Sequence, residues 1–282
     1  MSAPVITGAT ALAGVIGDPV RHSLSPTLHN AAYAALGLDL VYGAFVVHEG
    51  DAELALSGAR ALGFVGLSVT TPHKDAIAKA ADQRTHRVAM LGAANSVAFK
   101  DGASIADCTD GDGLLADLAR AWDFRPEAAR CAVLGAGGAA RAVVLALFDK
   151  GASEVAVINR SAERGRIAAA LAPHVGRLGA LEELSSFDLV VNATSIGLSG
   201  GADEARVAGS LAERLHEGQL VVDLVYRPSR TVFLDQASRR GATVRNGLGM
   251  LVHQAALQVE FFTGERAPID AMWEAVSSEA TS

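Results

Sequence analysis

The chain has 282 residues, 50% hydrophobic and 20% charged, a size and composition that allow two packed domains. The 31 acidic residues outnumber the 24 basic ones, and this formal net charge of −7, without any block of Lys or Arg, argues against nucleic-acid binding. The two cysteines and eight histidines show no disulfide or metal-ligand spacing, so no metal is expected. No apolar run reaches the roughly 20 residues of a membrane span. Met1–Gly17 lacks a signal-peptide layout, so we expect a cytoplasmic protein without membrane contact.

The first part of the chain alternates short apolar strands with helices. Strands are predicted over 15–17, 41–47 and 66–69, and helices over 26–37 and 52–62. Pro26 suits the first turn of its helix, and Ser25 is the expected N-cap. The alternation predicts an α/β domain with a parallel sheet.

The second part opens after a segment of turn composition, 102–112, and a helix over 114–121. Strands are expected over 131–134, 155–158, 189–191, 220–225 and 242–244, and a last helix over 250–262. We therefore expect one domain over 1–108 and a doubly wound, Rossmann-type domain over 109–245. The helices within 246–282 are expected to pack back on the first domain.

A glycine-rich loop follows the strand over 131–134 and opens a helix. Its residues have the Gly-x-Gly-x-x-Ala spacing of a dinucleotide-binding fingerprint: Gly135-Ala136-Gly137-Gly138-Ala139-Ala140. The first glycine permits a tight turn, the second lets a pyrophosphate approach the backbone, and the alanine permits close packing of helix on strand. The helix N-terminus then offers N–H groups and a favourable dipole to the phosphates.

The next strand ends in Asn159-Arg160-Ser161, with Arg164 one helical turn further on. An NAD-binding domain usually carries an acidic residue here to hold the ribose 2′-hydroxyl. Two guanidinium groups with an amide and a hydroxyl instead suit a 2′-phosphate, so NADP is the expected cofactor. The alternative is a solvated helix start with exposed arginines.

Eight motifs follow one another along the chain: His22-Ser23-Leu24-Ser25-Pro26-x-x-His29-Asn30, Ser68-Val69-Thr70-x-Pro72-x-Lys74, Gly92-Ala93-Ala94-Asn95, Thr109-Asp110-Gly111-x-Gly113, Asn159-Arg160-Ser161, Asn192-Ala193-Thr194-Ser195-x-Gly197, Asp223-x-Val225-Tyr226-x-Pro228 and Gly247-x-x-Met250-Leu251-x-x-Gln254. In these motifs and in their order, from Gly17 to Gln254, the chain resembles the shikimate dehydrogenase family.

The resemblance implies a substrate domain followed by an NADP domain, with both ligands held between them and hinges near Thr109 and Asn246. It implies that Ser23 and Ser25 grip the substrate carboxylate, although N-capping by Ser25 alone would leave Ser23 without a role. Lys74 and Asp110 match the family's catalytic pair: the lysine gives a proton to the developing alkoxide, and the carboxylate orients it. An isolated lysine after a turn is more often simply solvated.

Other site residues follow from the same resemblance. Thr70, Asn95 and Gln254 are implied to bind ring hydroxyls, and Tyr226 to contact the substrate on the side that faces the cofactor. The alternatives are a turn residue for Asn95, a surface position for Gln254 and a core residue for Tyr226. The nicotinamide half of the cofactor is implied to contact the following residues: Thr194, Ser195, Val225, Gly247 and Met250, the last being equally suited to fill a core. Ser68 stands where the family often has a substrate-binding Asn, and Cys108 also replaces a frequent Asn. Both differences bear on affinity and substrate preference more than on the chemistry.

The expected activity is the reversible, NADPH-dependent reduction of 3-dehydroshikimate to shikimate in aromatic amino acid biosynthesis, by a monomer or homodimer. Alternatives are a paralogue acting on quinate or aminoshikimate and a non-catalytic NADP-sensing protein. A paralogue that prefers quinate and NAD would be expected to carry an acidic residue after the strand over 155–158, where this chain has Asn159 and Arg160. The presence of both Lys74 and Asp110 argues against a non-catalytic sensor. A folate-type dehydrogenase would have no use for the paired serines before Pro26.

Overall fold

A computed structural model describes residues 6–196 and 201–277 of the chain. The chain folds into two compact units. The first contains the residues up to Thr109 and those from Val252, and the second contains Asp110–Leu251. The sequence predicts limits after residues 108 and 245, so the second unit extends further into the last long helix than expected. No helix in the described ranges is long and apolar enough to cross a membrane.

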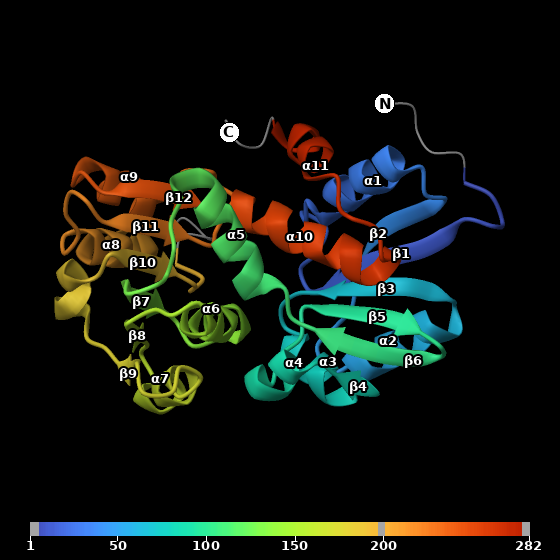
Figure 1. The fold of residues 1–282 in the computed structure, drawn as a ribbon, viewed down its shortest axis with the longest axis horizontal. Coiled ribbons are helices and arrows are strands. Elements are labelled where there is room, and N and C mark those ends of the chain that lie inside the picture. Colours follow the sequence, from blue (N-terminus) through green and yellow to red (C-terminus); the bar gives the residue numbers. More distant parts are fainter. Residues whose placement is uncertain (1–5, 197–200, 278–282) are drawn as a thin grey trace. The chain divides into compact units, whose positions relative to one another are not determined.

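The first unit contains one sheet with helices on both sides (Figure 1). Its elements in chain order are β1 (Ala11–Gly17), α1 (Ser25–Leu36), β2 (Leu40–Val46), α2 (Ala52–Ala61), β3 (Phe64–Val69), α3 (Lys74–Ala80), β4 (Gln83–Arg84), α4 (His86–Leu91), β5 (Ser96–Lys100), β6 (Ala103–Asp107) and α11 (Ile269–Ala275), together with most of α10 (Leu248–Thr263). The strand order is β2-β1-β3-β5-β6-β4.

The expected parallel pairing is found for β1 with β2 and β3, whereas β5 runs antiparallel to both β3 and β6. The prediction of a turn over 102–112 is therefore wrong. Most of this segment forms β6 and the start of the next helix. Its Ser104 and Asp107 made it resemble a turn, but a strand that pairs with β5 on one side and β4 on the other is stabilised by its ladder hydrogen bonds.

The second unit is a six-stranded, all-parallel sheet in the order β12-β11-β10-β7-β8-β9, as a Rossmann-type domain requires. Its elements are α5 (Asp110–Trp122), β7 (Arg130–Leu134), α6 (Gly138–Asp149), β8 (Glu154–Ile158), α7 (Ala162–Ala169), β9 (Gly176–Leu178), the 3₁₀ helix η1 (Leu181–Ser186), β10 (Leu189–Asn192), α8 (Ala202–Ala212), β11 (Leu220–Asp223), α9 (Val232–Arg239), β12 (Thr243–Asn246) and the first turn of α10.

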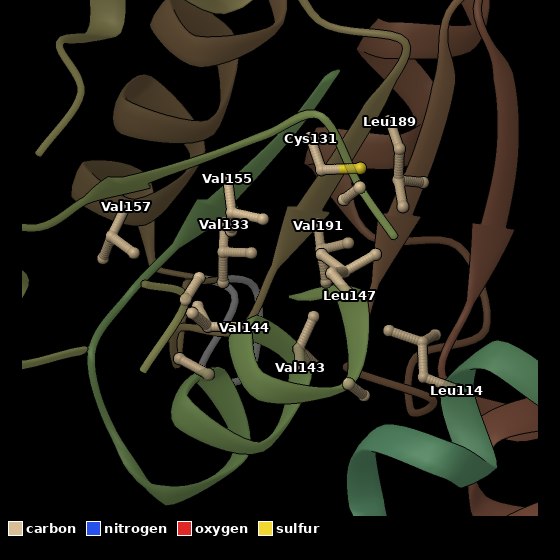
Figure 2. Close-up of a cluster of buried hydrophobic side chains, with 14 of the residues drawn as sticks. Leu114, Cys131, Val133, Val143, Val144, Leu147, Val155, Val157, Leu189 and Val191 are labelled. Carbon is tan, nitrogen blue, oxygen red and sulfur yellow. The ribbon is translucent and has the colours of Figure 1, made fainter. Parts of the chain in front are cut away.

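Two apolar clusters cover the two faces of this sheet. One packs α5, α6 and α7 against β7, β8 and β10, and the other packs α8 and α9 against the opposite face. Figure 2 shows the first cluster, in which Val133, Val155 and Val191 point from the strands toward Val143, Val144 and Leu147 of α6. Cys131 belongs to this core, and burial raises the pKa of its thiol to about 12, so it is an inert packing residue.

Candidate active site

In the first unit, the expected substrate residues gather at one edge of the sheet. β1 and β3 are parallel and end at this edge, while the antiparallel β5 begins there and β6 ends there. The loops that carry Thr70 and Asn95 therefore leave the sheet side by side, and Thr109 follows β6 closely. Two backbone bonds fix them: Thr70 N donates to Ile16 O (3.0 Å) and Val69 N to Asn95 O (2.7 Å).

Gly17, at the end of β1, has no room for a side chain because Thr70 lies against it. A Cβ at this position would come within 2.3 Å of the Thr70 Cγ2 atom and 3.1 Å of the Thr71 carbonyl oxygen. The glycine therefore allows the two strand ends to approach, which keeps Thr70 close to the loop that carries Ser23.

The two serines before α1 are paired, but Ser25 is not the N-cap that the sequence predicts. The helix begins at Ser25 itself, its N-cap is Leu24, and no side chain caps it. Ser23 Oγ instead accepts the N–H of Ser25 at 3.2 Å and donates to Ser25 Oγ at 3.1 Å. The capping alternative is thus wrong, and the two hydroxyls lie together at the N-terminus of α1, where the helix dipole favours an anion.

Lys74 is the first residue of α3 and is half-buried. Its backbone carbonyl accepts a hydrogen bond from Ala94 N (3.0 Å), and Asn95 N donates to Asp107 O (3.1 Å). The start of α3 is therefore tied to the loop that carries Asn95, which places Lys74 at the same sheet edge as Thr70 and Asn95. These backbone bonds fix the position of Lys74, and its catalytic role stays a prediction.

Asn95, Thr109 and Gln254 form a buried polar cluster. Asn95 Nδ2 donates to Thr109 Oγ1 (3.0 Å) and to Gln254 Oε1 (3.3 Å), and Thr109 Oγ1 donates to Gln254 O (3.1 Å). Only 2% of the surface of Asn95 and 7% of that of Gln254 is exposed, so Gln254 is not the surface residue that was the alternative. Asn95 lies at a bend in the loop before β5 and is buried there.

Ser68 is joined to this cluster through Gln258 and also bonds Tyr42, two residues that the sequence did not suggest. Tyr42 Oη donates to Ser68 Oγ and Ser68 Oγ donates to Gln258 Oε1, both at 2.5 Å. A signal for Gln258 exists in hindsight, because it follows Gln254 by four residues on one helix and so shares its face. Tyr42 gives no such signal, since an aromatic residue in a strand is ordinary core.

Asp110, the other half of the expected catalytic pair, is the first residue of α5 and is 5% exposed. It belongs to the second unit, whereas Lys74 belongs to the first. Gly111 brings α5 close to α6, because a Cβ there would lie 2.3 Å from the carbonyl oxygen of Ala142. This close packing fixes the first turn of α5, to which Asp110 belongs.

The glycine-rich loop of the second unit has the geometry of a nucleotide cradle. Gly135 has φ +108°, a conformation that favours glycine, and packs against the backbone of Ala193 after β10. Gly137 is the N-cap of α6, and a Cβ built on it would meet nothing within 4 Å. Ala136 is buried, Gly138 and Ala139 form the first turn of α6, and the space over Gly137 is thus open to a ligand at a helix N-terminus.

The end of β8 presents two cations at the expected position. Arg160 and Arg164 are exposed, and neither guanidinium has a carboxylate partner among residues 6–196 and 201–277. Ser161 Oγ caps α7 by accepting from Arg164 N (3.3 Å), and Asn159 Nδ2 donates to Ser161 O (2.9 Å). The loop is therefore held by its own hydrogen bonds, with the two guanidinium groups available to an anion.

A buried carboxylate, Asp223, ties together the loops that follow β10 and β11. Its Oδ1 accepts from Asn192 Nδ2 (3.0 Å) and Val225 N (3.1 Å), and its Oδ2 accepts from Thr231 Oγ1 (2.7 Å). Asn192 Oδ1 in turn accepts from the backbone N and the Oγ1 of Thr194. Burial raises the pKa of the Asp223 carboxyl from 3.8 to about 6, although its three donors oppose the change.

The remaining expected cofactor residues lie in the second unit. Thr194 and Ser195 follow β10, and Gly197 of the same motif lies outside the described residues. Gly247 N donates to Val225 O (3.1 Å), and a Cβ on Gly247 would come within 2.0 Å of Leu224 O. Met250 packs in the core of the unit, the use that the sequence left open for it, and Tyr226 is half-buried.

The fold and the two sets of residues define a class of protein: a two-domain, NADP-dependent oxidoreductase. Residues 15–97 match the family model of the shikimate dehydrogenase substrate binding domain. Residues 118–226 match the model of shikimate / quinate 5-dehydrogenase, and residues 247–276 that of the shikimate 5′-dehydrogenase C-terminal domain. The chain belongs to the shikimate dehydrogenase family.

Individual relatives agree with this assignment. A protein named shikimate dehydrogenase (NADP(+)) from Methanopyrus kandleri is 44% identical over 96% of each chain, and one of the same name from Citrifermentans bemidjiense is 43% identical over 98% of each. Among solved structures, shikimate 5-dehydrogenase from Thermus thermophilus in complex with NADP(H) and shikimate is 34% identical, with a TM-score of 0.86 over 95% of this chain and 99% of that one.

Proposed function

We propose that this protein catalyses the reversible, NADP-dependent interconversion of 3-dehydroshikimate and shikimate. The observation that carries the proposal is the buried polar cluster of Asn95, Thr109 and Gln254 in the first unit. The loop that carries Asn95 is bonded through Ala94 N to the backbone carbonyl of Lys74 at the start of α3. A small ring with several hydroxyls and a carboxylate needs such a set of fixed donors and acceptors, because unpaired buried polar groups are costly.

The residues of the second unit fit NADP. Gly137 leaves open space at the N-terminus of α6, which suits a pyrophosphate, and Arg160 and Arg164 suit a 2′-phosphate. When bound, the reduced cofactor supplies the hydride that the substrate carbonyl carbon accepts. Thr194, Ser195, Val225 and Gly247 are proposed to contact its nicotinamide half.

The residues of this chain are proposed to supply the proton and the orientation. As the carbonyl carbon of 3-dehydroshikimate gains a hydride, its oxygen becomes an alkoxide and takes a proton from Lys74 Nζ. The lysine ends as a neutral amine and regains its proton from solvent; in the reverse direction it acts as the base. Asp110 orients the ammonium group, and Ser23 and Ser25 hold the substrate carboxylate.

Turnover tests the proposal directly. With purified protein, reduced-nicotinamide absorbance is followed with shikimate or quinate and with NADP or NAD, in all four combinations. We expect the pair of shikimate and NADP to give the highest kcat/KM. A preference for quinate or NAD would place the protein in a paralogous group, and absence of turnover in all mixtures would favour a sensor.

Arg160→Ala is expected to weaken NADPH binding by about 10- to 100-fold, because a charge-assisted hydrogen bond to phosphate contributes roughly 1.5–3 kcal/mol. NADH binding should change less than threefold, since NADH has no 2′-phosphate. Arg166→Ala removes the same charge from an exposed position of α7 and serves as the control. Equal effects of the two substitutions on NADPH affinity would contradict the role of Arg160.

A further inference from the structure

A chain of four buried side chains crosses the first unit from β2 through β3 to α10. Tyr42 contacts Ser68, Ser68 contacts Gln258, and Gln258 Nε2 lies 2.9 Å from Gln254 Oε1. None of the four is more than 7% exposed, so water does not substitute for any of these bonds. The chain ends at Gln254, the residue proposed above to bind substrate.

Every bond in this chain has a fixed direction. Gln258 Nε2 also donates to the backbone carbonyl of Asn95 at 3.2 Å, and a carbonyl can only accept, so the amide nitrogen of Gln258 must lie on this side. The oxygen Oε1 of Gln258 then faces Ser68, which must donate its single proton to it. Ser68 can consequently only accept from Tyr42. Burial raises the pKa of Tyr42 well above its ordinary value, which keeps the phenol protonated as the first donor.

The direction of the chain decides which atom Gln254 can offer to a ligand. Its Oε1 accepts from both Gln258 Nε2 (2.9 Å) and Asn95 Nδ2 (3.3 Å), which uses both lone pairs of that oxygen. Any further partner of this amide must therefore be an acceptor for Nε2. The proton of Ser68 is likewise used inside the protein, so Ser68 cannot donate it to a substrate.

We infer that Gln258 is a positioning residue that sets Gln254 as a hydrogen-bond donor toward the substrate, with Ser68 and Tyr42 supporting it. The inference rests on the proposed function and deepens it. An N–H donor binds an oxygen whether it is a hydroxyl or a carbonyl, whereas an acceptor would bind only the hydroxyl. A donor fixed in this way suits an enzyme that must bind the oxidised and the reduced form of one ring.

Gln258→Met tests this inference, because it keeps the length of the side chain but removes its hydrogen bonds. The Oε1 of Gln254 then loses the shorter of its two hydrogen bonds and keeps only the 3.3 Å bond from Asn95 Nδ2, so the amide is held less firmly in this orientation. We expect KM for shikimate to rise about tenfold, with KM for NADP within twofold of the wild-type value. In a protein that also carries Gln254→Ala, the Gln258→Met substitution should have no further effect on KM for shikimate, because Gln258 acts through Gln254.

Ser104→Ala is the matched control for a merely structural effect. Ser104 is buried in the same unit and exchanges hydrogen bonds with Asp82, outside the chain described above. This variant should lose stability but keep both KM values. Where the methionine variant does not fold, Ser68→Ala removes the donor to Gln258 and should raise KM for shikimate about threefold, again without a change for NADP.

The outcomes separate the inference from the proposed function. If the wild type turns over shikimate but the folded Gln258→Met variant has an unchanged KM for it, the inference alone is overturned. The same holds for Ser68→Ala where that variant is used instead. Additive effects of Gln254→Ala and Gln258→Met on KM also overturn it, because they would show that Gln258 acts independently. Absence of wild-type turnover with shikimate overturns the proposed function and the inference together.

Discussion

Replacing Lys74 by methionine is expected to lower kcat for shikimate oxidation with NADP by about 10³-fold or more. The substitution keeps the length of the side chain but removes the group that takes the proton from the substrate hydroxyl and stabilises the alkoxide in the transition state. The same loss is expected for the reduction of 3-dehydroshikimate, because one group serves both directions. Steady-state absorbance measurements with each substrate provide kcat and KM.

The matched control is Lys79→Met, which removes an exposed lysine from the last turn of the same helix, α3. It should leave kcat within about twofold of the wild type, since it changes the charge of the helix but no group at the sheet edge. KM for NADP should be unchanged in both variants. If Lys74→Met retained a tenth or more of the wild-type kcat, another group would have to handle the proton.

The parts of the fold that depend on local pattern could be predicted from the sequence. The loop from Gly135 to Gly138 was recognisable because a strand, two spaced glycines and a helix start are adjacent in the chain, and the structure has all three. The strand β6 could not be recognised in the same way. The hydroxyl of Ser104 bonds the carboxylate of Asp82, 22 residues earlier in the chain. A polar residue that is typical of a turn is therefore accommodated in a strand by a tertiary contact.

The helix start at Ser25 illustrates a different limit. Serine before proline is a typical N-cap, and only the observed backbone of Leu24 (φ −82°, ψ −5°) moves the cap one residue earlier. The bond between Ser68 and Gln258 joins residues 190 positions apart, and no spacing rule connects them. Its direction depends on the bond from Gln258 Nε2 to the carbonyl of Asn95, so the sequence alone could not predict this part of the site. The contacts of the other site residues with ligands remain predictions.

Asp223 is expected to lower the stability of the protein as the pH rises from about 4 to 6. Its pKa is raised from 3.8 to about 6 in the folded protein, chiefly by burial. Between these values the unfolded chain has released the proton and the folded chain still holds it, so the free energy of unfolding falls with rising pH. A difference of about two pH units corresponds to roughly 3 kcal/mol.

Asp223→Asn isolates this contribution, because the amide oxygen can accept from Asn192 and Val225 while the amide nitrogen donates to Thr231 Oγ1. Urea unfolding at pH 4, 6 and 8 should show the variant gaining up to about 3 kcal/mol relative to the wild type between pH 4 and 8. A pH-independent difference would contradict the raised pKa. Asp223→Ala leaves the three donors unpaired, so it should lose about 3 kcal/mol or more and raise KM for NADP, because the loop that carries Thr194 loses its anchor.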